Sequence, residues 1–310
     1  MTSSGPPPDP LDAPAQFYRR VLSVLRSARV PFLVGGTYAF TSYTGIGRRT
    51  KDIDLFVRPE DCDAALEALK ADGFGTQKPY PHWLAKAHYG EDFVDVIYRS
   101  GNGLSAVDDG WFERAAEGEV LGVPVLLCPP EEVLWTKAFI MERERYDGAD
   151  VAHLLLAAAP RLDWKLLLYR FGDDWRVLLA HLVLFGYIFP SERNRVPREV
   201  MEVLLARLAH EVAEPPPFER VCQGTLLSRG QYLVDVEERG FEDGRLRPDV
   251  EMTAEDIAHW TSAIPEADRP TQRLVGNGDG ASPSARSPGS APPVLRWPRG
   301  GRRGRRSRRA

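Results

Sequence analysis

Apolar residues recur along the first half of the chain in two periods. Apolar positions three and four residues apart predict helices, and apolar positions two residues apart predict strands. The first period predicts helices over 14–29, 37–43 and 61–71, the last of them closed by Gly73. The second predicts strands over 32–34, 53–57, 82–88, 93–98 and 120–128, with a turn at residues 122–124.

The second half of the chain shows the helical period almost alone. It predicts helices over 131–144, 148–159, 163–170, 174–188, 197–213 and 254–263, with Thr253 as the cap of the last one. Residues 218–250 follow neither period. We therefore expect an α/β (α+β) core with a short mixed sheet over 14–129, followed by a mostly helical domain over 130–270.

Composition excludes several classes of protein. The chain has 310 residues, of which 43% are hydrophobic and 27% charged, as in ordinary globular proteins. Its three cysteines are too few and too scattered for a disulfide framework or a zinc site. No apolar run reaches the roughly 18 to 20 residues of a membrane helix, and the first residues do not resemble a signal peptide. We therefore expect a cytoplasmic protein without a membrane partner.

Charge is distributed unevenly along the chain. The formal net charge is −4, but residues 271–310 contain ten arginines and one aspartate, a net charge of +9, which leaves −13 for residues 1–270. The composition of this tail and of residues 1–13 predicts disorder. A cationic arm such as 296–309 can bind RNA without sequence preference, although a solvated extension has the same composition.

The first candidate site combines a glycine pair with two aspartates. Gly35 and Gly36 come between a predicted strand and a predicted helix, where free backbone N–H groups and the helix dipole favour a phosphate. Asp52 and Asp54 are two residues apart on the next predicted strand and therefore face the same side. Two such carboxylates repel each other unless a cation lies between them. This pattern predicts a site for a nucleoside triphosphate with Mg²⁺.

A third carboxylate, Asp95, lies in the apolar segment 93–97. An unpaired buried carboxylate is costly, so Asp95 either joins Asp52 and Asp54 or pairs with an arginine for structural reasons. If its strand neighbours the strand of Asp52 and Asp54, the three carboxylates can hold one or two Mg²⁺ ions. Asp95 would then be the third ligand and could assist deprotonation of an attacking hydroxyl.

These motifs together resemble the DNA polymerase beta-like nucleotidyltransferase superfamily. The chain looks most similar to a bacterial stand-alone branch related to abortive-infection type IV toxins. The details that carry this resemblance are Arg48-Arg49-Thr50-Lys51 before Asp52, Gly122-Val123-Pro124-Val125 before Pro129-Pro130-Glu131-Glu132, and the segment from Lys137 to Val151. The resemblance covers about 30–157.

The resemblance implies a Mg²⁺-dependent enzyme that moves a nucleoside monophosphate from a triphosphate such as ATP to an acceptor and releases pyrophosphate. It assigns the metal and the catalysis to Asp52, Asp54 and Asp95. It assigns nucleotide binding to Gly35, Gly36, Thr37, Arg49, Thr50 and Lys137. An Arg/Asp cluster that includes Arg145, Asp147 and Asp150 would border the site.

Several alternatives stay open at this stage. The acceptor can be an RNA such as tRNA, a small molecule or a protein side chain, and a protein partner is not identified. The same fold can also serve as a non-catalytic nucleotide-binding or antitoxin-like module. Lys137 can be a solvent-facing helix residue, and the glycine pair a simple tight turn.

Overall fold

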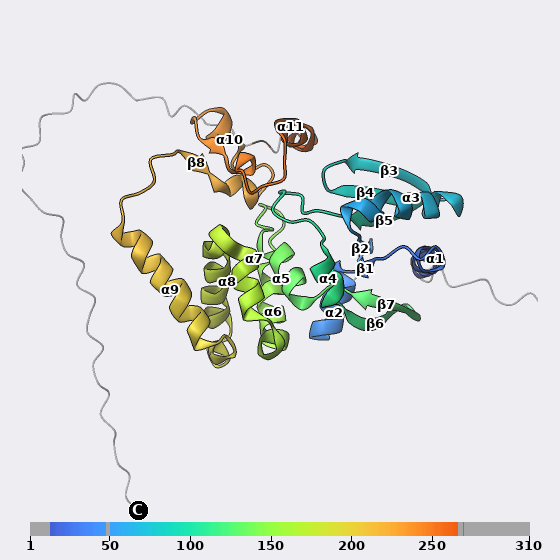
Figure 1. The fold of residues 1–310 in the computed structure, drawn as a ribbon, viewed down its shortest axis with the longest axis horizontal. Coiled ribbons are helices and arrows are strands. Elements are labelled where there is room, and N and C mark those ends of the chain that lie inside the picture. Colours follow the sequence, from blue (N-terminus) through green and yellow to red (C-terminus); the bar gives the residue numbers. More distant parts are fainter. Residues whose placement is uncertain (1–12, 48–49, 266–268, 270–310) are drawn as a thin grey trace, which may run out of the picture. The chain divides into compact units, whose positions relative to one another are not determined.

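A seven-stranded mixed sheet organises residues 33–127 of the computed structural model, which describes residues 13–47, 50–265 and 269 (Figure 1). The strands lie in the order β3-β4-β5-β2-β1-β7-β6. Their bounds are β1 Leu33–Val34, β2 Asp54–Phe56, β3 Gly75–Tyr80, β4 Leu84–Tyr89, β5 Asp92–Ile97, β6 Ala116–Val120 and β7 Val123–Leu127. The pairs β1–β7 and β2–β5 are parallel, and the others are antiparallel. The predicted mixed sheet is confirmed.

The two strands at the edges of this sheet, β3 and β6, were missed by the sequence pattern. An edge strand is covered less fully than a central one, so it needs no strict alternation of apolar residues. The predicted turn at 122–124 is also shifted. Leu121 and Gly122 form the two-residue turn with φ of 54° and 78°, and Val123 already pairs with Val120. Positive φ at both central residues matches the twist of a tight hairpin.

The sheet has helices on both faces. Leu55 of β2 packs into a buried cluster with residues of α1 (Ala13–Ser27) and α3 (Cys62–Ala71). Its neighbour Phe56 points to the opposite face and packs near α2 (Gly36–Thr44) and α4 (Asp109–Glu113). The alternation along the predicted strand 53–57 therefore separates the two faces as expected. Helix α4 was not predicted; it is short and begins at Asp108, whose side chain accepts a hydrogen bond from the Trp111 N–H.

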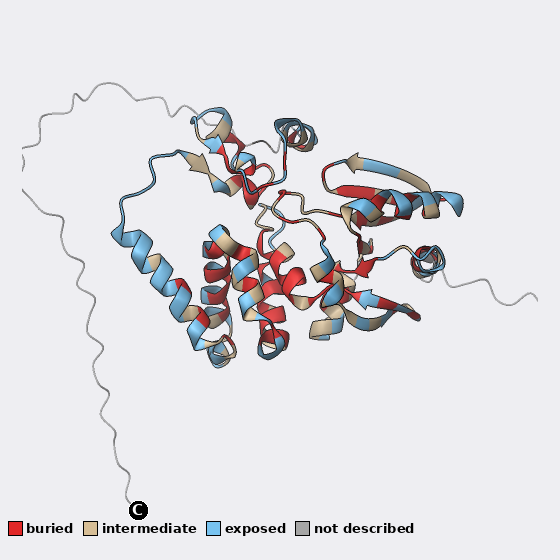
Figure 2. Ribbon diagram, viewed as in Figure 1, coloured by how far each residue is buried: buried red, intermediate tan, exposed pale blue. Residues whose placement is uncertain are grey.

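The rest of the described chain is mostly helical. Its main helices are α5 Pro130–Ala138, α6 Gly148–Ala158, α7 Trp164–Phe171, α8 Trp175–Ile188 and α9 Arg198–Ala213. Short elements follow: β8 Val221–Cys222, α10 Leu233–Glu237, β9 Glu242–Asp243 and α11 Ala254–Ser262. Short 3₁₀ turns are η2 Pro59–Asp61, η3 Ala159–Arg161, η4 Gly172–Asp174, η5 Arg193–Arg195, η6 Gln223–Leu226 and η7 Gly244–Leu246. Buried residues continue from α2 and β2 into α5, α6 and α8, whereas α9 is largely exposed (Figure 2).

Helix α5 ends at Ala138 and not at residue 144 as predicted. Beyond it the backbone turns back, and Met141 forms an isolated β-bridge with Tyr146. The N–H of Met141 donates to the carbonyl of Leu227 at 3.0 Å. A contact with a distant segment therefore replaces the next turn of a helix that the local sequence allows. By contrast, α11 begins at Thr253 as predicted, in a capping box with Asp256.

Some expectations concern residues outside the described part of the chain. These are the predicted disorder of 1–13, of which only Ala13 is described, as the first residue of α1, and of the tail 271–310, including the proposed RNA-binding arm 296–309. Within the described residues, none of the helices combines the length and the apolar character needed to cross a membrane.

A buried ion-pair network joins the sheet region to the helical part. The Glu132 side chain on α5 is fully buried and accepts hydrogen bonds from Arg114, at 3.0 Å, and from Arg170 on α7, at 2.9 Å. Arg170 also pairs with Asp108 at 3.0 Å. Burial raises the pKa of Glu132, and the two guanidinium groups act in the opposite direction. The network holds α5 between α4 and α7.

We expect Glu132→Ala to destabilise the fold by about 3 kcal/mol, because removing one partner of a buried ion pair leaves the other charges uncompensated. Urea unfolding followed by circular dichroism measures this change. The control is Glu211→Ala, which removes the partly exposed partner of Arg176 and should cost less than about 1 kcal/mol. Equal losses in the two variants would show that the network does not join the two parts.

Candidate functional site

The backbone of the sheet places two of the three aspartates side by side. Strands β2 and β5 run parallel, with Asp54 directly opposite Asp95. The Asp95 N–H donates to the Ile53 carbonyl at 3.1 Å, which fixes this register. Residues opposite each other on adjacent strands point to the same face, about 4.8 Å apart at the backbone. The predicted adjacency of the Asp54 and Asp95 strands is thus present in the structure.

The glycine pair lies against the Asp54 carboxylate. The Gly35 N–H donates to the Asp54 carbonyl at 2.9 Å, and Gly36 opens α2 with a φ of 51°. A Cβ atom on Gly36 would lie 1.6 Å from Oδ2 of Asp54, so a side chain at this position would collide with the carboxylate. The first N–H groups of a helix have no partner within it and favour an anion. The start of α2, where free N–H groups favour an anion, therefore lies against the Asp54 carboxylate.

Asp52 lies just before β2 and is held by the preceding loop. The Thr50 hydroxyl lies 2.8 Å from Oδ1 of Asp52 and 3.0 Å from its backbone carbonyl. The structure therefore shows Thr50 orienting Asp52, and its predicted contact with nucleotide stays a prediction. Arg49, assigned to nucleotide binding from the sequence, lies outside the described residues.

Negative charge accumulates at this site. Burial, together with the charges of Asp52 and Asp95, raises the pKa of Asp54 to about 7. Burial also raises the pKa of Asp95, against the opposing effect of Lys86. Burial is the main cause of both shifts, and the charges of neighbouring carboxylates add to it. A cation beside Asp54 would offset both effects on its pKa.

We tested whether these residues suit Mg²⁺ by the chemistry of their donors. The carboxylate oxygens of the three aspartates match the oxygen ligands that Mg²⁺ prefers, together with water and substrate phosphate. The three carboxylates do not converge on one point, since no group of three or more His, Cys, Asp or Glu within the described residues has the arrangement of a metal site. The donor set fits Mg²⁺, and Asp95 is held by a different cation, Lys86.

Positive charge borders the site from the helical side. Lys137 on α5 pairs with Asp147 at 2.9 Å and with Asp150 at 2.8 Å, and Arg145 pairs with Asp147 at 3.2 Å. The charges of Lys137 and Arg145 both act to lower the pKa of Asp54. The Arg/Asp cluster implied by the sequence resemblance is therefore close enough to influence the carboxylates, and phosphate contact by Lys137 stays a prediction.

Sequence reasoning missed two residues of this site. Lys86 on β4 lies opposite Asp95, and its Nζ is 2.5 Å from Oδ1 of that aspartate. A lysine between two alanines in a predicted strand was the available signal. Tyr38 on α2 was also missed; burial raises the pKa of its hydroxyl, and the negative charge of Asp52 adds to this. Nothing in the local pattern distinguished Tyr38 from a core tyrosine.

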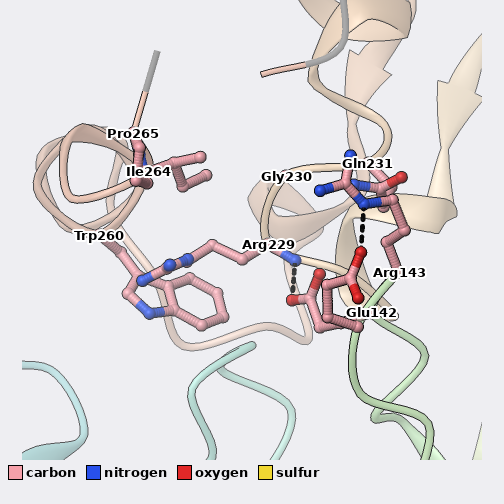
Figure 3. A pocket seen from close by; sticks show the side chains of 9 residues that line it. Glu142, Arg143, Arg229, Gly230, Gln231, Trp260, Ile264 and Pro265 are labelled. Atoms are coloured by element: carbon pink, nitrogen blue, oxygen red, sulfur yellow. Dashed lines mark hydrogen bonds and ion pairs between the residues drawn. The ribbon is translucent and has the colours of Figure 1, made fainter. Parts of the chain in front are cut away.

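A cavity of about 360 Å³ lies beside the turn that follows α5 (Figure 3). The Glu142 N–H donates to the Arg145 carbonyl at 2.8 Å, so Glu142 and Arg145 face each other across this turn. Oε1 of Glu142 accepts the Arg229 N–H at 2.7 Å, which connects the turn to the segment before α10. Figure 3 shows Trp260, Ile264 and Pro265 on one side of the cavity and Glu142, Arg143 and Gln231 on the other.

Comparison with known proteins gives distant structural likenesses. No protein-family model matches the sequence, and no curated protein matches it significantly. A lincosamide antibiotic adenylyltransferase, bound to lincomycin, is 14% identical with a TM-score of 0.33 over 46% of this chain and 95% of its own. ANT(2″)-Ia in complex with adenylyl-2″-tobramycin is 16% identical with a TM-score of 0.33 over 64% and 98%. An antigenic nucleotidyltransferase-like protein from Paracoccidioides brasiliensis is 16% identical with a TM-score of 0.39 over 59% and 92%.

The names of these proteins refer to adenylyl or nucleotidyl groups, and none of them refers to a toxin. Likeness at this distance carries no conclusion about activity.

We expect Gly36→Ala to abolish nucleotide binding, because the added methyl group displaces the Asp54 carboxylate. The matched control is Gly45→Ala at the other end of α2. Gly45 has a φ of 72° and open space around its Cβ position. This variant therefore introduces backbone strain of about 1–2 kcal/mol without a collision. The measurement is the thermal shift caused by ATP and Mg²⁺. The assignment is wrong if both variants keep the same shift.

We expect the stability gain of Asp54→Asn over the wild type to increase between pH 5 and pH 8 in metal-free buffer. The folded-state pKa of Asp54, about 7, lies above its ordinary value. The protonated Asp54 side chain therefore makes its full contribution to wild-type stability below about pH 4, and this contribution is lost as pH rises through 7. The difference in Tm should grow by roughly 3 °C or more. The exposed carboxylate variant Asp63→Asn should show no such growth.

Proposed function

We propose that the protein transfers a nucleoside monophosphate from a nucleoside triphosphate to an acceptor hydroxyl and releases pyrophosphate. The observation that carries this proposal is the contact between the Asp54 carboxylate and Gly36 at the start of α2, with Asp95 in register beside Asp54. A phosphate-binding helix start and a set of cation-binding carboxylates are thereby parts of one site. A triphosphate with its bound cation is a ligand that needs both.

The substrate roles follow from this arrangement. The backbone N–H groups of Gly36 and Thr37 would receive the triphosphate, because they lie in the first turn of α2. Gly35 is required at this position because a Cβ atom on the residue would lie 2.2 Å from the ring of Phe56. Lys137 and Arg145 lie on the helical side and would neutralise phosphate charge.

In the reaction, the acceptor oxygen forms a bond to the α-phosphorus, and the bond from that phosphorus to the pyrophosphate oxygen breaks. The hydroxyl proton passes to a carboxylate, for which Asp95 is our candidate because it lies in register beside Asp54. One or two Mg²⁺ ions held by Asp52, Asp54 and Asp95 would neutralise the triphosphate and make the acceptor hydroxyl more acidic. The chain itself orients the two reactants.

An RNA such as tRNA is the first acceptor to test, because the arginine-rich segment 296–309 carries positive charge suited to a phosphate backbone. The cavity beside Arg145 carries carboxylate, guanidinium and indole groups. This mixed lining also accommodates small molecules and protein side chains. A toxin-like role, a cytoplasmic location and a preference for ATP belong to the same proposal.

The test is a transfer screen. Wild-type protein is incubated with each α-labelled triphosphate, Mg²⁺ and separate pools of bacterial RNA, protein and small hydroxyl compounds. We expect label to move to one acceptor pool, and we expect Asp54→Ala to reduce this transfer to background. The variant should keep a Tm near that of the wild type, because it removes one of several repelling carboxylates.

Asp63→Ala is the matched control, since it removes an exposed aspartate of α3 that pairs with Lys78 at 2.6 Å. It should retain full transfer. Full transfer by Asp54→Ala would contradict the site assignment. Mg²⁺-dependent binding of triphosphate without transfer to any pool would favour the non-catalytic binding module.

A further inference from the structure

Lys86 gives the third carboxylate a counter-ion within the fold. It lies on β4 opposite Asp95 in an antiparallel pair, and its Nζ is 2.5 Å from Oδ1 of Asp95. The side chains are 25% and 15% exposed, so the pair is largely shielded from water. Such shielding strengthens an ion pair compared with one at the surface. The Lys86–Asp95 ion pair is therefore a stable contact of the fold rather than a transient surface contact.

The position of the ammonium group is further fixed by an aromatic ring. Nζ of Lys86 lies 4.2 Å from the centroid of Phe93, within cation–π distance. Phe93 and Asp95 are both on β5 and two residues apart, so they face the same side of the sheet. Lys86 is thus held between the ring and the carboxylate.

Asp95 also belongs to the candidate cation site through its register with Asp54. The same carboxylate therefore has two possible positive partners, Lys86 and a divalent cation. Among the described residues, no group of three or more Asp, Glu, His or Cys side chains has the arrangement of a metal site. The ammonium charge of Lys86 beside Asp95 also offsets part of the repulsion among the three aspartates.

We propose that Lys86 is a positioning residue that holds Asp95 before the divalent cation binds and competes with that cation for the carboxylate. This inference rests on the proposed function, because that function supplies the reason for a cation at Asp95. Cation binding must weaken the Lys86–Asp95 pair, so Lys86 lowers the affinity of the free protein for the metal. A triphosphate brings a bound cation and additional negative charge, and both favour cation binding at Asp95 over the Lys86 pair.

A purely structural ion pair gives a different expectation. Removing one partner of a structural pair lowers stability and leaves metal affinity unchanged or weaker. Competition requires the opposite change in metal affinity, namely tighter binding. The decisive measurement is therefore the affinity for the metal, with stability as a second readout.

The experiment measures Mn²⁺ binding to the full chain by electron paramagnetic resonance, without nucleotide or acceptor. We expect Lys86→Met to bind Mn²⁺ more tightly by about fivefold or more, within the range of couplings between contacting groups. We expect its metal-free Tm to fall and its Tm gain on adding Mn²⁺ to exceed that of the wild type. Lys86→Arg keeps the charge and should bind Mn²⁺ as the wild type does.

The matched control is Lys78→Met on β3, which removes another lysine–aspartate pair, Lys78 with Asp63 at 2.6 Å. It should leave Mn²⁺ affinity unchanged. The dependence on Asp95 is tested by adding Lys86→Met to an Asp95→Asn background, where the gain in affinity should disappear. This comparison stays informative even if Lys86→Met alone is unstable.

Unchanged or weaker Mn²⁺ binding by Lys86→Met would overturn the inference. A gain in affinity that persists in the Asp95→Asn background would overturn it as well. If the wild type transfers nucleotide and the Lys86→Met affinity is unchanged, only the role of Lys86 is wrong. If the wild type neither binds Mn²⁺ nor transfers nucleotide, the proposed function is wrong together with it.

Discussion

The close placement of like charges is the constraint on which the site depends. The parallel register of β2 and β5 sets Asp54 beside Asp95, and the loop before β2 adds Asp52. Backbone hydrogen bonds fix the positions of Asp54 and Asp95 on their strands, and the Thr50 hydroxyl holds Asp52. Burial, together with repulsion from Asp52 and Asp95, raises the pKa of Asp54 to about 7. A site that maintains such repulsion is suited to bind a cation.

The surrounding residues limit this charge without removing it. Lys86 pairs with Asp95 from the neighbouring strand, and Lys137 acts on Asp54 from α5. Lys137 is itself shared with Asp147 and Asp150, so its charge is only partly available to the site. The balance leaves net negative charge in the absence of a ligand. Added positive charge is therefore favourable there, and the N-terminus of α2 lies next to it for an anion.

The helical part contributes to the site as well as to stability. The α5 helix carries Lys137 toward the carboxylates, and the buried Glu132 on the same helix fixes it to Arg114 and Arg170. The early end of α5 allows the following turn to reach Leu227 and to present Arg145. Charge at the candidate site and packing of the helical part therefore depend on the same short helix.

The sequence by itself determined those features that depend on neighbouring residues. The alternation around Asp54 set the two faces of its strand, the glycine pair marked the start of α2, and Thr253 marked the start of α11. These features are encoded locally, because strand period, glycine conformation and helix capping each involve only a few consecutive residues. The order of Gly35-Gly36, Asp52, Asp54 and Asp95 was sufficient to suggest one site.

Only the tertiary structure decided the features that depend on residues far apart in the chain. The edge strands β3 and β6 lack an apolar pattern. They are strands because their backbones pair with the neighbouring strands β4 and β7. The end of α5 is set by Leu227, which is 86 residues beyond Met141. The contact of Lys86 with Asp95 is set by the register of β4 against β5. Strand register and long-range hydrogen bonds are chosen by the packing of the whole core, so the local pattern carries no signal for them.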